Sequence, residues 1–299
     1  MEEFLNKTRP FFASMSYGKQ LFLLLSVAIL LLILSSAFLT GIGVRFMCTD
    51  HIYFLRLVQF LNAIVLFLLP ALLFSKWVNG GFWSYSQADI VPQGRMFPIV
   101  IGLSICILPV IAVLGYLNEL VQLPAFFEKI EIWMREMEER SNDILLLMME
   151  TKTIPALLLN LLLMAIMPSI CEEFFFRGAL QPLLQKWSNN KHFAIWITAF
   201  IFSAIHLQFY GFIPRFLLGA YLGYLMLWTC SIWLPVFAHF LHNGITILLV
   251  FFVGKSGNPE FFEQITPEIM KQLLPWAALS LVGLFFGIQR LYKMREKEM

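Results

Sequence analysis

Six polar side chains lie inside stretches of the sequence that are otherwise apolar. They are Glu172, Glu173, Arg177, His206, His239 and Asn243. A charge near the centre of a bilayer costs about 2.5 to 3.5 kcal/mol even on a lenient insertion scale, so a membrane helix does not carry several without a reason. Buried glutamate and histidine side chains can act as general bases, bind a metal ion or relay protons. The set therefore predicts a functional site within a membrane protein.

Helical spacing sorts these residues onto faces. Glu173 and Arg177 are four residues apart and can pair on one face, whereas Glu172 is turned away by about 100° and stays free. His239 and Asn243 are also four residues apart, so they present an imidazole and an amide together. We expect four side chains to converge on one cavity: Glu172, His206, His239 and Asn243. Glu173 is expected to point elsewhere.

Two neighbouring residues have a weaker case for a part in the chemistry. His242 follows His239 by three residues and lies close to the same face, but of the three histidines it best fits a structural role. Cys171 has only the already paired Arg177 as a nearby positive charge, so its thiol is expected to be buried and inert.

The elements that position these residues follow from composition. Of 299 residues, 59% are hydrophobic and 13% charged, against about 25% charged in soluble domains. The apolar residues fall in blocks of about 20, the length that a helix needs to cross a bilayer. We predict an all-α fold, a polytopic integral membrane helical bundle with about eight transmembrane helices. The expected spans are 21–43, 52–74, 97–118, 155–183, 193–208, 211–229, 232–253 and 271–292.

The turns between the later spans decide which helices are neighbours. Very short connections separate the fifth, sixth and seventh spans, so these helices must be antiparallel neighbours, and they should pack with the fourth. All six polar residues lie on the fourth, fifth and seventh spans. Counting residues from the helix ends places the site in one layer, nearer the side of the chain termini.

Charge in the loops indicates the orientation of the chain. An even number of spans puts both termini on one side, and that side is the richer in lysine and arginine once the long loop 119–155 is discounted. The positive-inside rule then predicts a multi-pass protein of the cell membrane with both termini in the cytoplasm. The net charge is only +2 and no basic run is long enough to follow a phosphate backbone, so nucleic acid is excluded as a partner.

One segment between the third and fourth spans is amphipathic. In residues 123–140, aromatic and aliphatic side chains recur at helical spacing among charges. The pattern suits a helix that lies on the membrane surface, and it equally suits a helix that covers the end of the bundle.

The ordered motifs resemble those of a known family. The Glu172-Glu173-xxx-Arg177 segment, then Phe202-xxx-His206, then His239-xxx-Asn243 are similar to the three motifs of the CAAX protease and bacteriocin-processing (Abi) family, which includes the type II CAAX prenyl endopeptidase. The resemblance covers about residues 157–252. It implies an intramembrane endopeptidase acting on a membrane-associated or C-terminal, CAAX-like substrate.

The resemblance also implies a role for each residue. Glu172 and His206 would activate a water molecule, and His239 and Asn243 would form the oxyanion hole. Glu173 and Arg177 would support the helix and tune the field around Glu172. The chain would then divide into three regions: 1–154 with the N-terminal helices and the amphipathic segment, 155–253 with the catalytic core, and 254–299 with the last helix and a basic tail.

Other functional interpretations of the same residues stay open. Glu172, His206 and His239 form a His₂Glu set like that of many zinc metalloproteases, although HExxH is absent and the expected cofactor is none. A membrane scaffold or a bacteriocin-immunity protein is a second alternative, but a protein without activity would be expected to lose at least one motif. A proton-coupled transporter is a third alternative, but the sequence contains no internal repeat of the kind that supports it. The expected partners are a protein or peptide substrate, with or without a lipid anchor, and the membrane lipids.

Overall fold

The computed structural model describes residues 12–46, 51–149, 153–255 and 266–296, and throughout these ranges the chain forms helices without a strand. Within these ranges, seven helices are long and apolar enough to cross a membrane. They are α2 (Tyr17–Phe46), α3–η1–α4 (Ile52–Asn62, Ala63–Leu68, Leu69–Asn79), α6 (Met96–Glu119), α8–η3–α9–η4–α10 (Ile154–Asn160, Leu161–Ile166, Met167–Phe175, Phe176–Leu180, Gln181–Ser188), α12 (Phe212–Thr229), α13 (Trp233–Lys255) and α14 (Pro267–Glu296). The polytopic helical membrane bundle is therefore confirmed.

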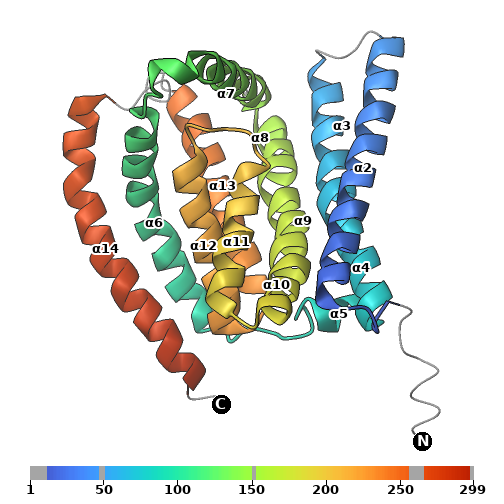
Figure 1. Cartoon of the computed structure of the whole chain (residues 1–299). Helices are drawn as coiled ribbons and strands as arrows, with labels where there is room; N and C mark the ends of the chain where they lie inside the picture. The colour runs from blue at the N-terminus through green and yellow to red at the C-terminus, as the bar shows by residue number, and fades with distance from the viewer. Residues whose placement is uncertain (1–11, 47–50, 150–152, 256–265, 297–299) are drawn as a thin grey trace, which may run out of the picture.

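The fifth expected span is shorter than the others. It forms α11 (Lys191–Ala204), which has 14 residues and is therefore about 21 Å long. Together with the seven long helices it gives eight passes through the bundle. The first described helix begins, and the last one ends, at the same end of the bundle (Figure 1). Seven of the eight predicted spans are therefore long enough to cross a membrane, and α11 is the shorter eighth.

The long helices are interrupted by wide π-helical turns, each followed closely by a proline. The turn η1 precedes Pro70, η3 precedes Pro168, and η4 precedes a third proline at the start of α10. Proline lacks an N–H and its ring clashes with the carbonyl four residues earlier, and a local π turn is one way in which a membrane helix accommodates this. Such turns are frequent at functional sites, and here two of them flank the short helix α9 that carries both glutamates.

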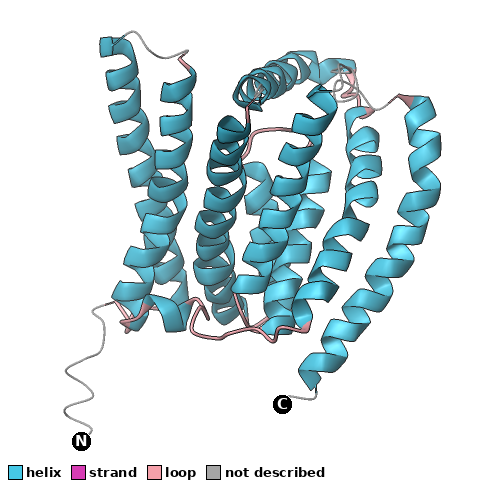
Figure 2. Cartoon of the chain, turned by 180° about the vertical axis from the view of Figure 1, so that it is seen from behind, coloured by secondary structure: helices cyan, strands magenta, loops and turns pink. Residues whose placement is uncertain are grey.

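Two groups of outer helices cover the central ones. Leu24 of α2 and Phe74 of α4 are buried against Phe176 and Leu180 of η4. On the opposite side, α6 and α14 pack against α12 and α13 through a second apolar core (Figure 2). The outermost helices α2 and α14 leave most of their apolar side chains exposed, as lipid contact requires. The helices α9, α11, α12 and α13 are thereby held at the centre of the bundle.

The amphipathic segment forms η2 (Ala125–Phe127) and α7 (Glu128–Met149), which lies across the end of the bundle opposite the chain ends (Figure 1). Its Trp133 ring is 5.3 Å from the Phe209 ring, and the Arg135 guanidinium lies 4.7 Å from the centre of the Tyr210 ring. The backbone N–H of Tyr210 also donates to Glu138 at 3.2 Å. These contacts support the second alternative, a helix that covers the bundle.

Candidate active site

The structure gathers the predicted site residues around one cavity of about 410 Å³. The predicted residues that line it are Glu172, His206, His239 and Asn243. The His206 ring lies 5.2 Å and the His239 ring 5.9 Å from the ring of Phe202, so the two imidazoles are at most about 11 Å apart. The expected convergence is present, while the catalytic roles of the four residues stay predictions.

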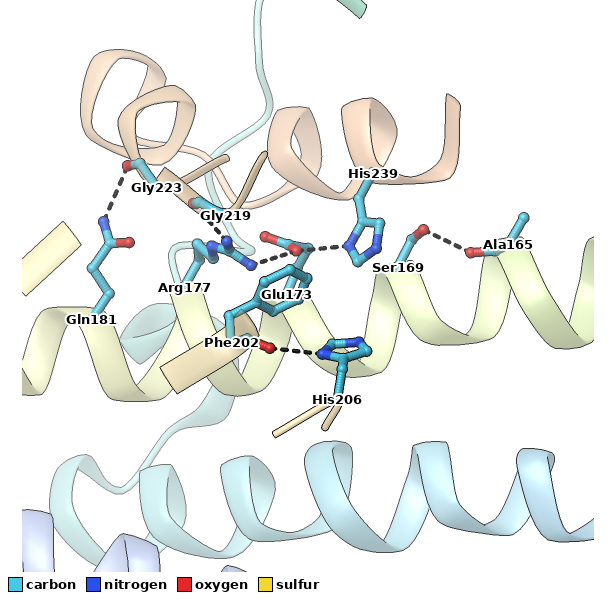
Figure 3. A network of polar contacts seen from close by, with 10 residues as sticks. All are labelled: Ala165, Ser169, Glu173, Arg177, Gln181, Phe202, His206, Gly219, Gly223 and His239. Atoms are coloured by element: carbon cyan, nitrogen blue, oxygen red, sulfur yellow. Dashed lines mark hydrogen bonds and ion pairs between the residues drawn. The ribbon is translucent and has the colours of Figure 1, made fainter. Parts of the chain in front are cut away.

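Glu173 and Arg177 form the ion pair expected from their spacing. Arg177 Nη1 donates to Glu173 Oε1 at 2.7 Å, and both side chains are fully buried. Arg177 Nη2 donates to the carbonyl oxygen of Gly219 at 2.7 Å, which ties α12 to η4 (Figure 3). The guanidinium carbon also lies 4.9 Å from the centre of the Phe202 ring. The pair therefore holds three helices together.

The expectation that Glu173 points away from the site needs a correction. Glu173 does not line the cavity, but its Oε1 lies 2.8 Å from Nδ1 of His239 (Figure 3). The same carboxylate oxygen thus contacts Arg177 on one side and His239 on the other. The sequence showed only the contact within one helix, because the second contact depends on how α13 packs against α9. The contact with Glu173 fixes the orientation of the His239 ring through Nδ1. Nε2 is then the ring nitrogen that remains for another partner.

His206 lies just beyond α11, in the turn that leads to α12. Its Nδ1 donates to the carbonyl oxygen of Phe202 at 2.7 Å, and a carbonyl can only accept, so Nδ1 carries the proton. In the neutral ring Nε2 is then an acceptor. Leu207 follows with a positive φ of 53°, an uncommon conformation for a residue other than glycine. This turn redirects the chain and ends the helix before His206.

The turn is held by α6. Asn118 is buried, and its Nδ2 donates to the carbonyl oxygen of Phe209 at 2.9 Å while its Oδ1 accepts from the backbone N–H of Ile213 at 3.0 Å. Glu138 of α7 supports the same turn, and burial raises the pKa of its carboxyl group, opposed by the hydrogen bond from Tyr210 N–H. The position of His206 therefore depends on two elements outside the motif region.

The side-chain amide of Asn243 donates one hydrogen bond within the protein. Its Nδ2 donates to the carbonyl oxygen of Met164 at 3.3 Å, which leaves the second amide hydrogen for another acceptor.

His242, for which the sequence suggested a structural role, lines the cavity, and its buried Nδ1 has no hydrogen-bond partner among the described residues. The structural role of His242 stays a prediction. Cys171 is buried, as expected.

Arg215 is a site residue that the sequence analysis missed. It lies near the start of α12 and lines the cavity. Its Nη2 donates to Oε1 of Gln208 at 2.7 Å, and its charge interacts with the carboxylates of Glu138 and Glu172. In the count of loop charges from the sequence, Arg215 belongs to the side opposite the termini, as an ordinary cation near a helix end. Its position within the predicted span 211–229 was the available signal.

The cavity lies toward the α7 end of the bundle. Leu145 and Met149 of α7 line it, together with Gln208 and Gly211 of the turn between α11 and α12. In the bundle this is the end opposite the chain ends (Figure 1). The site does form one layer, but the expectation that this layer lies nearer the termini is wrong. The error arose because α11 is short and His206 lies beyond its far end.

The side chains do not form a metal site in this arrangement. Within the described ranges, no three histidine, cysteine, aspartate or glutamate side chains are grouped so that they could hold an ion. The set Glu172, His206 and His239 is not among such groups, and whether the protein uses zinc stays an open prediction.

The fold and the cavity together define a multi-pass helical membrane protein with a polar site inside its bundle. Residues 154–245 match the family model described as type II CAAX prenyl endopeptidase Rce1-like. The match covers about a third of the chain and includes all six predicted site residues. It confirms the resemblance and supports an intramembrane CAAX-type endopeptidase in general. No significant match was found among curated proteins or solved structures.

Proposed function

We propose that this protein is an intramembrane endopeptidase that uses a water molecule activated by Glu172 and His206. The observation that carries the proposal is the shared cavity, lined by Glu172, His206, His239 and Asn243. Both imidazoles are fixed through Nδ1, one by the Glu173 carboxylate and the other by the Phe202 carbonyl. Preorganised side chains of this kind are what general-base catalysis requires.

The proposed reaction begins with the water. Glu172 accepts one proton from it while Nε2 of His206 accepts a hydrogen bond, and the water oxygen forms a bond to the peptide carbonyl carbon. The carbonyl oxygen becomes an oxyanion, which receives hydrogen bonds from Nδ2 of Asn243 and from Nε2 of His239. For His239 to donate there while Nδ1 donates to Glu173, the ring must be an imidazolium, and Glu173 provides its counter-charge. Glu172 then returns its proton to the leaving nitrogen as the carbon–nitrogen bond breaks.

The proposed substrate is a membrane-associated protein or peptide, cleaved near its C-terminus as in CAAX-like substrates, with or without a lipid anchor. The membrane lipids surround the protein as its other partners. An apolar cavity wall suits an apolar peptide, because the lining includes Ile111, Leu145, Met149, Met164 and Leu218.

We also propose an orientation for the chain in the cell membrane. Two of the cations that the sequence assigned to the side opposite the termini lie within the bundle: Arg56 is buried on α3 and bonded to Asn160, and Arg215 lines the cavity. The loops on that side therefore carry fewer positive charges than counted, which favours cytoplasmic termini more strongly. The cavity would then lie nearer the extracytoplasmic end of the bundle.

The test is cleavage of a peptide library by the purified protein in detergent. Lipidated and unlipidated peptides are incubated with the wild type, with Glu172→Gln, and with Glu139→Gln, which changes an exposed glutamate of α7. Mass spectrometry identifies the products. Cleavage by the wild type and by Glu139→Gln, and its loss in Glu172→Gln, supports the proposal. Cleavage of no peptide by any of the three proteins favours the scaffold alternative.

A second experiment, with a metal chelator, distinguishes the proposed mechanism from the metalloprotease alternative. The contact between Glu173 and His239 is of the kind that orients metal-bound imidazoles in metalloenzymes, so the reaction is repeated after treatment with a chelator and again after addition of zinc. Unchanged activity supports the water mechanism proposed above. Loss of activity with chelator and recovery with zinc would replace it.

A further inference from the structure

The cavity contains one basic side chain that the proposed reaction does not use. Among the described residues that line the cavity, Glu172 is the only acid and Arg215 the only lysine or arginine. Arg215 donates to the side chain of Gln208 at 2.7 Å and to its carbonyl oxygen at 3.4 Å. Both acceptors are neutral. In the described part of the chain no carboxylate lies within 4 Å of Arg215, so Glu138 and Glu172 interact with its charge only at longer range.

The surroundings leave the guanidinium open to a ligand. Gly211 lies beside it, and a Cβ at this position would be 3.1 Å from Nη2, so glycine keeps the space around the side chain free. His242 lines the same cavity with a buried Nδ1 that has no partner in the described part of the structure. The guanidinium of Arg215 and the imidazole of His242 therefore belong to residues that line the same cavity.

We propose that Arg215, assisted by His242, binds the C-terminal carboxylate of the peptide substrate. This inference rests on the proposed peptidase function and deepens it. An arginine presents a rigid fork of N–H donors that matches a carboxylate. A volume of about 410 Å³ is in the range of small-ligand pockets, so the cavity suits a short chain end rather than a long segment passing through. The C-terminus of a peptide carries a free carboxylate whatever the sequence of the peptide.

The position of Arg215 then sets where the chain is cut. Glu172 and Arg215 line the same small cavity, so a peptide anchored by its carboxylate places a bond only a few residues from its end beside Glu172. A substrate that lacks the carboxylate would leave Arg215 without its ligand. Arg215 is thus a specificity-determining residue, distinct from the residues that act on the reacting atoms.

The test compares two peptides of identical sequence, one ending in a free carboxylate and the other in a carboxamide. A hydrogen bond to a charged group contributes enough that the wild type should prefer the acid by about 10- to 100-fold in kcat/KM. Arg215→Gln should abolish the preference by lowering kcat/KM for the acid to that of the amide, mainly by raising KM. Arg215→Lys, which keeps the charge without the fork, should retain part of the preference.

Two control variants separate the charge from the fold. Gln208→Ala removes the hydrogen bond to Arg215 but keeps the guanidinium, so the preference for the acid should persist. Lys129→Gln removes an exposed cation of α7 at the same end of the bundle and should change neither substrate. Equal cleavage of acid and amide by the wild type would overturn the inference while leaving the proposed function intact. An equal loss on both substrates in Arg215→Gln would show that Arg215 acts through Glu172 or the fold.

A binding measurement keeps the inference testable without turnover. Fluorescent acid and amide peptides are titrated onto the Glu172→Gln protein in detergent, with and without Arg215→Gln. Tighter binding of the acid, lost when Arg215 is replaced, supports the carboxylate subsite even where no peptide is cleaved. Equal binding of both peptides to the Glu172→Gln protein would overturn it.

Discussion

Replacing Arg177 should destabilise the fold through the charge that it leaves behind. Arg177 is fully buried and contacts Glu173 Oε1 and the Gly219 carbonyl oxygen, each at 2.7 Å. In Arg177→Met the apolar volume is largely kept, but Glu173 stays buried with only His239 beside it. Breaking a buried ion pair by removing one partner costs about 3 to 5 kcal/mol. We expect a large loss of folded protein and a clearly lower unfolding temperature.

A second change should reverse much of this loss. In the double variant Glu173→Gln with Arg177→Met both members of the ion pair are neutral, and replacing a buried pair by neutral residues of similar volume is often close to neutral for stability. The glutamine oxygen can still accept a hydrogen bond from Nδ1 of His239, so the ring keeps a partner. The double variant should therefore be more stable than Arg177→Met alone.

The assay is thermal unfolding of the detergent-purified proteins, followed by size-exclusion chromatography of the soluble fraction. Wild type, Glu173→Gln, Arg177→Met and the double variant are compared at one detergent concentration. An Arg177→Met protein as stable as the wild type would refute the reasoning, as would a double variant no more stable than the single one. Either result would mean that the charges of Glu173 and Arg177 do not determine the stability of the fold.

Further predictions concern the oxyanion site, the turn, the helix contacts and the orientation. Asn243→Ala should lower turnover by about 10²- to 10³-fold with unchanged unfolding, measured by steady-state kinetics. Leu207→Gly should be tolerated at its positive φ, whereas Leu207→Val should lower the unfolding temperature because a β-branched residue is strained there; equal stability of the two variants would count against the turn geometry. Gly219→Val should destabilise by about 1 to 3 kcal/mol, because even a Cβ would lie 3.2 Å from Ala199 Cα, and a wild-type melting curve would contradict this. In a cysteine-free background, Glu139→Cys should react with an impermeant reagent added outside intact cells while a cysteine added after the C-terminus should not; the reverse pattern would reverse the proposed orientation.

The bundle and its motif helices could be predicted because they depend on local sequence. Long apolar blocks specify membrane helices without reference to their neighbours. The four-residue spacing places Glu173 beside Arg177 within one helix, and the structure shows that contact at 2.7 Å. Short turns likewise determined which helices are adjacent.

The remaining features depend on packing between distant segments. The contact between Glu173 and His239 joins residues 66 positions apart, so helical spacing alone could not reveal it. Hydropathy extended the fifth span through His206, whereas the positive φ of Leu207 and the hydrogen bonds from Asn118 end the helix earlier. Arg215 was counted with the loops because a cation near a helix end usually faces water. Its place in the cavity became visible only with α7 and the turn before α12 in position.

The most direct test of the central claim is the rate of cleavage by Glu172→Gln on a substrate that the wild type cleaves. Glutamine keeps the shape of the side chain but cannot accept the proton from water. We predict a rate lower by about 10²- to 10⁴-fold, with the same elution profile and unfolding temperature as the wild type and with Glu139→Gln fully active. A Glu172→Gln protein that cleaves at the wild-type rate would contradict the assignment of Glu172 as the general base.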